Sequence, residues 1–146
     1  MVYLAIPGLP PSSNNAYFNL PHGGRTLTTS GRKYLTETKV YIAQRFPQAM
    51  QQFRRDVPYL IVVRFTLLNL LTKGWPKTAK NRYKVLDVSN RIKLFEDALK
   101  DAAGIDDAQN MTIILDKVQG DNELTELWAW NLELEKNPFD DALRSL

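Results

Sequence analysis

Apolar and β-branched residues gather in segments that predict strands. Val2–Ile6 is a short one, and Tyr59–Leu68 is long and apolar around a single Arg64, which favours the centre of a sheet. Met111–Val118 and Leu124–Leu134 flank the strong turn sequence Gln-Gly-Asp-Asn. We therefore expect the last two segments to pair as an antiparallel C-terminal β-hairpin.

Two segments have the spacing of amphipathic helices. The first begins at a cap formed by Thr29 or Ser30, runs to about Phe46 and is ended by Pro47. The second has Asp87 in the position of an N-cap. Its apolar side is predicted to consist of Val88, Ile92, Phe95, Leu99 and Ala102. Gly104 is predicted to end the helix in a left-handed conformation.

The remaining segments are predicted to be loops and turns. Residues 7–15 contain three prolines and a glycine, which oppose regular structure, whereas a Gly-Gly turn predicts a small hairpin over residues 17–28. Residues 73–84 predict an exposed loop. We expect a single α+β domain over residues 1–146, with a mixed sheet and two main helices. Residues 137–146 are either a flexible tail or a segment that packs on a partner subunit.

The composition excludes several classes of protein. An apolar fraction of 44% is that of a folded globular chain. The chain has no cysteine and one histidine, so it cannot be a disulfide scaffold or a thiol enzyme, and any metal ion must be held mainly by oxygen. No apolar run has the length of a bilayer span and no signal peptide is recognisable, so we expect a cytoplasmic protein with no membrane partner.

Charge is distributed unevenly along the chain. Residues 21–55 carry a net charge of +6 and residues 73–84 one of +5, whereas residues 85–120 carry −3 and residues 121–146 carry −5. Clusters of Lys and Arg are typical of surfaces that contact nucleic-acid phosphates, although a merely solvated basic face has the same composition. Nucleic acid is therefore a candidate partner.

The candidate chemistry lies on and around the second predicted helix. Asn90, Lys93 and Asp97 fall on one polar stripe of it. Acidic residues lie just beyond both ends of this helix. Asp87 precedes it, and Asp106 and Asp107 follow it. Carboxylates beside a lysine suit Mg²⁺-assisted hydrolysis of a phosphodiester. A helix cap, an i,i+4 ion pair and a pair of turn residues would explain the same positions structurally.

Several motifs follow one another in the order of a family pattern. The weaker ones are Leu9–Tyr17 with its Pro-Pro-Ser-x-Asn signature, Gly24–Thr26 and Ser30–Tyr34. The more specific pattern is Asp-x-Asp-Asn-x-x-Lys, Asp-Ala-Leu, Gly and Asp-Asp-x-Gln, which corresponds to Asp87–Lys93, Asp97–Leu99, Gly104 and Asp106–Gln109. In these motifs the chain resembles the RusA family of Holliday-junction resolvases, small dimeric endodeoxyribonucleases of bacteria and their phages.

The resemblance implies roles for individual side chains. It assigns metal binding to Asp87 and to the second acid of the pair, Asp107, and it gives Lys93 a catalytic role. The cofactor would be Mg²⁺ or Mn²⁺, which would activate water while Lys93 stabilises charge on the phosphate. Asp106 is a neighbour that could also bind metal, because the spacing after the helix is shorter than the family's.

One position departs from the family pattern. Ser89 stands where the family has the second acid of Asp-x-Asp, so a ligand or general base is missing. A serine hydroxyl reaches Mg²⁺ directly or through water but adds no negative charge, so metal affinity should fall. Asp97 or Asp106 would compensate, and Asn90 is expected to support the site.

The function implied by the resemblance is resolution of four-way DNA junctions by paired incisions, in recombination and repair, without a nucleotide cofactor. The side chains expected to contact DNA are Arg25, Arg32, Lys33, Lys77, Lys80, Arg82 and Lys84, with Trp75 or Tyr83 stacking on an unpaired base. Because of Ser89, a junction-binding protein that has lost hydrolysis is the alternative. A small interaction protein unrelated to nucleic acid is a third.

The length of the second helix limits how closely Asp87 and Asp107 of one chain can approach each other. A helix over residues 88–103 is about 24 Å long. Asp87 and Asp107 begin at its opposite ends, and the chain after Gly104 reaches back about 10 Å at most. A straight helix therefore keeps both acids of one chain from binding one ion. Two chains with these helices packed antiparallel would bring Asp87 near the partner's Asp107, which predicts a homodimer.

Overall fold

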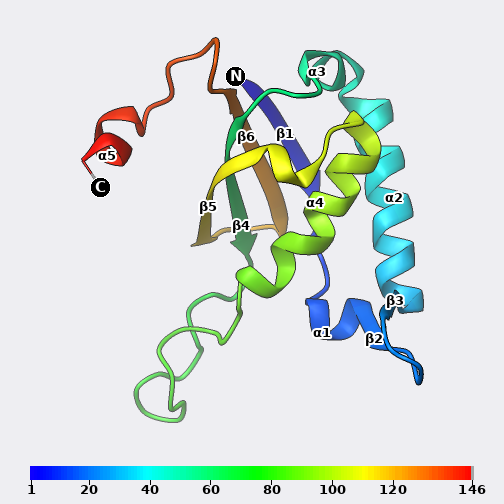
Figure 1. Ribbon diagram of the computed structural model, residues 1–146. Coiled ribbons are helices and arrows are strands. Elements are labelled where there is room, and N and C mark those ends of the chain that lie inside the picture. The colour runs from blue at the N-terminus through cyan, green and yellow to red at the C-terminus, as the bar shows by residue number, and fades with distance from the viewer. Residues whose placement is uncertain (146) are drawn as a thin grey trace.

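The fold is built on a four-stranded mixed sheet. The computed structural model describes residues 1–145, and its main sheet has the strand order β1 (Val2–Pro7), β6 (Leu124–Asn131), β4 (Tyr59–Leu67) and β5 (Asn110–Gln119) (Figure 1). β4 pairs in parallel with β5 and antiparallel with β6. The α+β class, the mixed sheet and the central position of β4 confirm the prediction.

The predicted C-terminal hairpin is wrong, because β4 lies between β5 and β6. The turn after β5 passes over the end of β4, where the Gly120 amide donates to the Leu67 carbonyl at 3.0 Å. A turn sequence predicts that the chain reverses, but not which strand becomes its neighbour. β4 is buried and needs hydrogen-bond partners along both edges, so it separates the two strands. β6 also ends at Asn131 rather than at Leu134.

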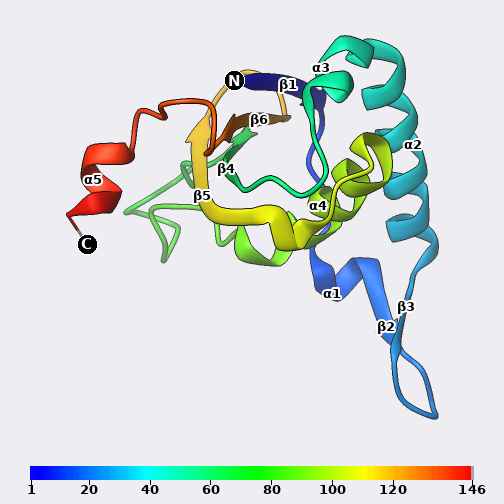
Figure 2. The same ribbon diagram turned by 45° about the horizontal axis from the view of Figure 1, so that its top comes forward.

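Two long helices cover one face of this sheet. α2 (Thr29–Arg45) and α4 (Ser89–Ala103) lie against it, with the short α3 (Pro47–Gln52) after α2 (Figures 1 and 2). The core between helices and sheet includes the fully buried side chains of Ile42, Phe65, Phe95, Leu99 and Leu127. Both predicted helices are confirmed, and their packing leaves the polar side of α4 open to solvent.

The helix ends differ in detail from the prediction. The N-cap of α2 is Thr28, one residue before the expected cap, and its hydroxyl accepts the Gly31 amide at 3.1 Å. The N-cap of α4 is Val88 rather than Asp87, although the Asp87 carboxylate still accepts the amide of the first helical residue at 3.0 Å. Gly104 ends α4 with a left-handed φ of 69°, as predicted.

Three short helical segments are absent from the sequence-based prediction. α1 (Ser13–Ala16) is a single turn, so the expectation that residues 7–15 have no regular structure is wrong for the last part of that segment. Pro47 ends α2 but also begins α3, because proline suits the first position of a helix. η1 (Asp107–Gln109) is a single 3-10 turn just before β5.

The smaller elements complete the chain. β2 (Tyr17–Asn19) and β3 (Arg25–Leu27) form the predicted hairpin. Residues 73–84 form a loop of mostly exposed side chains, as predicted. Both lie at the end of the molecule where α4 begins (Figure 1).

The chain ends in a short helix, α5 (Asp140–Arg144). Phe139, just before it, lies edge-on to Trp130 of β6 with 6.4 Å between the ring centroids. Leu146, the last residue of the segment in which we expected a flexible or dimer-packing tail, lies outside the described residues. Among residues 1–145 we find no helix whose length and apolar character would let it cross a bilayer.

Gly31, in the first turn of α2, lies directly against α1. A Cβ atom at this position would be 2.4 Å from the Ala16 carbonyl oxygen. We expect Gly31→Ala to destabilise the fold by about 2 kcal/mol, because the neighbouring atoms belong to the backbone and cannot easily move. Urea unfolding measures the change. The control Thr36→Ala, on the exposed side of α2, should change stability by less than about 0.5 kcal/mol. Equal midpoints for the two variants would contradict the close approach.

Candidate functional site

Lys93 is the centre of the candidate site. Its ammonium group lies 2.7 Å from the Asp107 carboxylate and 3.1 Å from that of Asp97, one helical turn further along α4. Asp97 also accepts the Tyr17 hydroxyl at 2.6 Å. The site therefore joins α4, the turn that follows α4, and the start of β2. The Lys93–Asp97 contact is the i,i+4 pair that the helical spacing predicted.

The Asp-Asp-x-Gln motif folds into a cap that presents Asp107. The Asp106 carboxylate accepts the Ala108 amide at 3.1 Å, and the Gln109 side chain accepts the Asp106 amide at 2.9 Å. The Gln109 side chain also donates to two backbone carbonyls before β4, at 3.0 and 2.9 Å. Asp106 is thus occupied by the backbone of the turn, whereas Asp107 faces Lys93.

The ion pair shifts both pKa values. The hydrogen bond from Lys93 lowers the pKa of Asp107 to about 2. The hydrogen bonds to Asp107 and then Asp97 raise the pKa of Lys93 above its usual value. Both groups are therefore charged at neutral pH. Lys93 therefore carries a positive charge there and cannot act as a base.

A buried carboxyl group behind this cluster was missed by the sequence analysis. Glu96 is 9% exposed and accepts the Asn110 side-chain amide at 2.8 Å, and burial raises its pKa. Its place in the sequence, next to Asp97, gives no sign of burial. Tyr17 was also missed as a site residue, because its partner Asp97 is 80 residues away in the chain.

A second polar group surrounds Asp87 at the start of α4. Its Oδ1 accepts the Ser89 hydroxyl at 2.6 Å and the Ser89 amide at 3.0 Å, and its Oδ2 accepts the Asn90 side-chain amide at 2.8 Å. The hydrogen bond from the Ser89 hydroxyl, supported by that from the Ser89 amide, lowers the pKa of Asp87. Ser89 therefore does not replace the missing carboxylate. It orients Asp87 and stabilises the negative charge of Asp87.

The structure does not join Asp87 to Asp107. The two carboxylates have no hydrogen-bond partner in common, and one lies at the start of α4 whereas the other packs along its side. α4 is about 22 Å long at 1.5 Å per residue. Within residues 1–145 no three His, Cys, Asp or Glu side chains gather in a way that could hold a metal ion. Within the described residues, Asp87 and Asp107 therefore belong to two separate hydrogen-bonded groups rather than to one cluster of metal ligands.

The side chains predicted to bind DNA form two groups. Arg25 on β3 lies over the Tyr17 ring at 5.5 Å, and Arg32 and Lys33 lie in the first turn of α2. The other group lies in the segment between β4 and α4, residues 68–86, which we call the finger. Its predicted members are Lys77, Lys80, Arg82 and Lys84. Figure 1 places the start of α4 between the finger and the β2–β3 hairpin.

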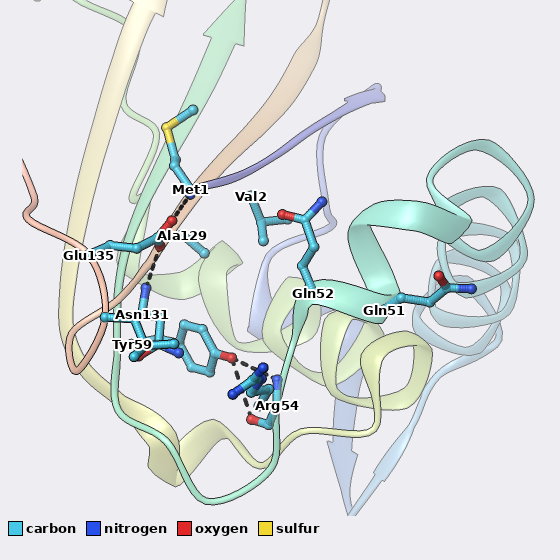
Figure 3. A pocket seen from close by; sticks show the side chains of 10 residues that line it. Met1, Val2, Gln51, Gln52, Arg54, Tyr59, Ala129, Asn131 and Glu135 are labelled. Carbon is cyan, nitrogen blue, oxygen red and sulfur yellow. Dashed lines mark hydrogen bonds and ion pairs between the residues drawn. The ribbon is translucent and has the colours of Figure 1, made fainter.

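A pocket elsewhere on the protein is not part of this site. It lies beside the start of β1 and the end of α3 (Figure 3). Its lining includes Met1, Gln51, Gln52, Arg54, Tyr59, Asn131 and Glu135. The Glu135 carboxylate is already engaged by the Met1 ammonium group and the Asn131 amide. No predicted site residue lines this pocket, so it is separate from the candidate site around Lys93.

These observations define an α+β domain with a lysine–carboxylate cluster near two basic surfaces, as in proteins that process nucleic-acid phosphates. The family model of the endodeoxyribonuclease RusA matches residues 7–127, and the chain belongs to the RusA family. This match confirms the resemblance seen in the motifs and argues against an interaction protein unrelated to nucleic acid. Enzymes of this family are Holliday-junction resolvases and generally depend on a divalent metal ion. A comparison with curated proteins finds no match.

Removing the lysine should raise the pKa of Asp107. In Lys93→Met we expect this pKa to move from about 2 toward the usual 3.8. Because folding lowers the pKa, the wild-type pair contributes stability at pH values above 3.8, and this contribution is lost as the pH falls through about 2. NMR titration of the Asp107 carboxyl carbon measures the pKa, with Lys39→Met on α2 as the control. The same value in both variants would rule out the ion pair.

Proposed function

We propose that the chain is a structure-selective endodeoxyribonuclease that resolves four-way DNA junctions by paired incisions and depends on Mg²⁺ or Mn²⁺. The observation that carries this proposal is the Lys93–Asp107 pair, 2.7 Å apart and formed by the two most specific motifs of the family. Membership of the RusA family supports the nuclease activity and the branched substrate. The proposed setting is recombination and repair.

The proposed catalytic residues are Asp87, Lys93 and Asp107. Lys93 remains a cation at neutral pH, so we assign to it the stabilisation of negative charge on the phosphate. We favour Asp107 over Asp106, because the Asp106 carboxylate is hydrogen-bonded to the backbone of its own turn. We assign Asp97 the positioning of Lys93, because its carboxylate lies 3.1 Å from the Lys93 ammonium group. Asn90 has the same role for Asp87.

We place the metal ion between two chains, because Asp87 and Asp107 of one chain belong to separate hydrogen-bonded groups. We propose a homodimer in which Asp87 of one protomer and the partner's Asp107 would hold the ion, with Ser89 beside Asp87. A two-fold axis would then generate two equal sites. Two equal sites on one dimer suit two incisions in strands of a symmetric junction.

The two basic groups are the proposed DNA-binding surfaces. Lys and Arg side chains that contact phosphates supply affinity without reading sequence. The finger and the region of β3 and α2 lie on either side of the start of α4, so DNA held by both would pass over Asp87 (Figure 1). The β3–α2 group consists of Arg25, Arg32 and Lys33.

Cleavage of a labelled four-way junction tests the proposal. We expect the wild-type chain to make symmetric nicks in the presence of Mg²⁺ and none in EDTA. Asp107→Asn should lower the cleavage rate by about 100-fold or more and leave junction binding intact, because it removes charge at the reacting centre. Asp106→Asn is the matched control, since an asparagine oxygen can still accept the Ala108 amide and keep the turn folded. Equal cleavage by both variants would overturn the assignment.

The rival function is a junction-binding protein that has lost hydrolysis. The observation that favours it is Ser89, which occupies the position of a family acid and donates its hydroxyl to Asp87 at 2.6 Å. Ser89→Asp restores the second acid and separates the two functions. Cleavage that appears only in Ser89→Asp identifies the binding protein. Cleavage by the wild-type chain that Asp107→Asn abolishes identifies the enzyme.

Mixing two inactive variants tests whether the acids act across the dimer. Asp87→Asn and Asp107→Asn should each be inactive alone. After subunit exchange, each mixed dimer has one site whose two acids are both wild type, one from each chain, so cleavage should return as nicks in one strand. Acids that act within one chain would leave the mixture inactive. Light scattering provides the second readout, because a monomeric wild-type chain would exclude the shared site.

A further inference from the structure

The finger extends away from the body of the protein between β4 and α4 (Figure 1). Its residues 73–84 carry five basic side chains and no acid. The same segment exposes two large aromatic side chains, Trp75 at 45% and Tyr83 at 49%. Basic side chains interleaved with exposed aromatic rings are typical of surfaces that bind nucleic acid, so this segment has the features of a binding element.

The two arms of the finger's stem are joined by a single antiparallel bridge. The Thr72 amide donates to the Arg82 carbonyl at 2.8 Å, and the Lys84 amide donates to the Leu70 carbonyl at 2.7 Å. Leu71 and Tyr83 form an antiparallel bridge between these hydrogen bonds. The backbone of both arms is therefore fixed, and the side chains that they carry are held at defined positions.

The last residues of β5 hold the base of this stem by hydrogen bonds. The Gln119 side-chain oxygen accepts the Leu70 amide at 2.7 Å and the Leu71 amide at 3.3 Å, and its NH₂ group donates to the Leu68 carbonyl. On the other arm, the Lys117 ammonium group donates to the Leu86 carbonyl at 3.1 Å. Both arms are thus attached to one strand of the sheet, which sets the direction in which the finger leaves the body.

Three side chains of the finger, one near its tip and two on its stem, form a preassembled stack. The Arg82 guanidinium carbon lies 5.3 Å from the centroid of the Trp75 ring and 5.4 Å from that of Tyr83. The tip is closed by the Thr78 amide, which donates to the Gly74 carbonyl at 2.7 Å. Cation–π contacts of this kind hold the rings before any ligand arrives and so reduce the entropy lost on binding.

The chemistry of this stack suits the flat faces of nucleobases. Aromatic rings and guanidinium groups both stack on unpaired bases. Inside a continuous duplex each base face is covered by its neighbours, whereas the crossing point of a branched DNA leaves base faces uncovered. Lys84 is three residues before Asp87, which limits the distance between their Cα atoms to about 10 Å. A base bound by the stack would therefore lie close to the start of α4.

We propose that the finger is a wedge that inserts the Trp75–Arg82–Tyr83 stack into the branch point of DNA and so gives the protein its preference for branched over linear substrates. Gln119 is the positioning residue of this wedge. The proposal rests on the proposed function, in that the ligand is the same branched DNA. It adds a selectivity element that is separate from the residues proposed for cleavage.

Equilibrium binding in EDTA tests the wedge without cleavage. The probes are a four-way junction and a linear duplex with the same arm sequence. The double variant Trp75→Ala/Tyr83→Ala should bind the junction at least about tenfold more weakly, because two stacking contacts are lost, and should bind the duplex within about twofold of wild type. Trp75→Phe/Tyr83→Phe keeps both rings and should retain the preference. Tyr3→Ala, which removes an aromatic ring on β1 that is 42% exposed, is the control for surface changes.

Gln119 provides an independent arm of the test. Gln119→Leu removes the acceptor of two finger amides and should lower junction preference while duplex affinity stays the same. Gln119→Glu keeps that acceptor but loses the donor to the Leu68 carbonyl, so it should restore part of the preference, a rescue that a general loss of stability would not show. The wedge is overturned if the aromatic variants lose junction and duplex affinity equally, or lose neither. If the wedge is overturned but the wild-type chain still cleaves junctions, the proposed function stands. A wild-type chain that neither prefers nor cleaves junctions overturns the wedge and the proposed function together.

Discussion

The parallel pairing of β4 with β5 is the constraint on which the rest of this molecule depends. Two parallel neighbours cannot be joined by a tight turn, so the chain must leave β4 at one end and return to β5 at the other. That return path contains the finger, α4 and η1 in this order. Lys93 lies on the crossover helix and Asp107 lies where the chain re-enters the sheet, so their contact follows from the connection. Site and finger are parts of one crossover.

The polar contacts of the site contribute to geometry more than to stability. The Lys93 and Asp107 side chains are 51% and 33% exposed, and water screens an ion pair of this kind strongly. The pair keeps Lys93 protonated and Asp107 ionised, and it orients the Asp107 carboxylate. The contact between Glu96 and Asn110 is different, because it is partly buried and ties α4 to the first residue of β5. The solvent-exposed Lys93–Asp107 pair thus lies beside a partly buried contact that fixes the position of α4 against β5.

Local patterns were predictable from the sequence, and long-range neighbours were not. The spacing of Phe95 and Leu99 gave α4 its boundaries to within two residues, because helical periodicity depends only on nearby positions. The strand order could not be derived, since a turn does not specify a partner. The motif favoured Asp107 over Asp106 only through the family resemblance, because the physical difference lies in a backbone hydrogen bond that Asp106 accepts. Glu96 was missed for a related reason, as its burial depends on the position of β5.

The cap formed by Asp106 and Gln109 places two unrelated requirements on consecutive residues. One carboxylate of the pair holds the turn together, and the next one faces Lys93. Alanine at Asp106 would remove the acceptor of the Ala108 amide and lower the amount of folded protein. Under the proposed function, alanine at Asp107 would instead slow the chemical step in protein of normal abundance. A genetic screen that scores only survival would therefore record one functional motif, although one acid of the pair holds the turn together and the next one faces Lys93.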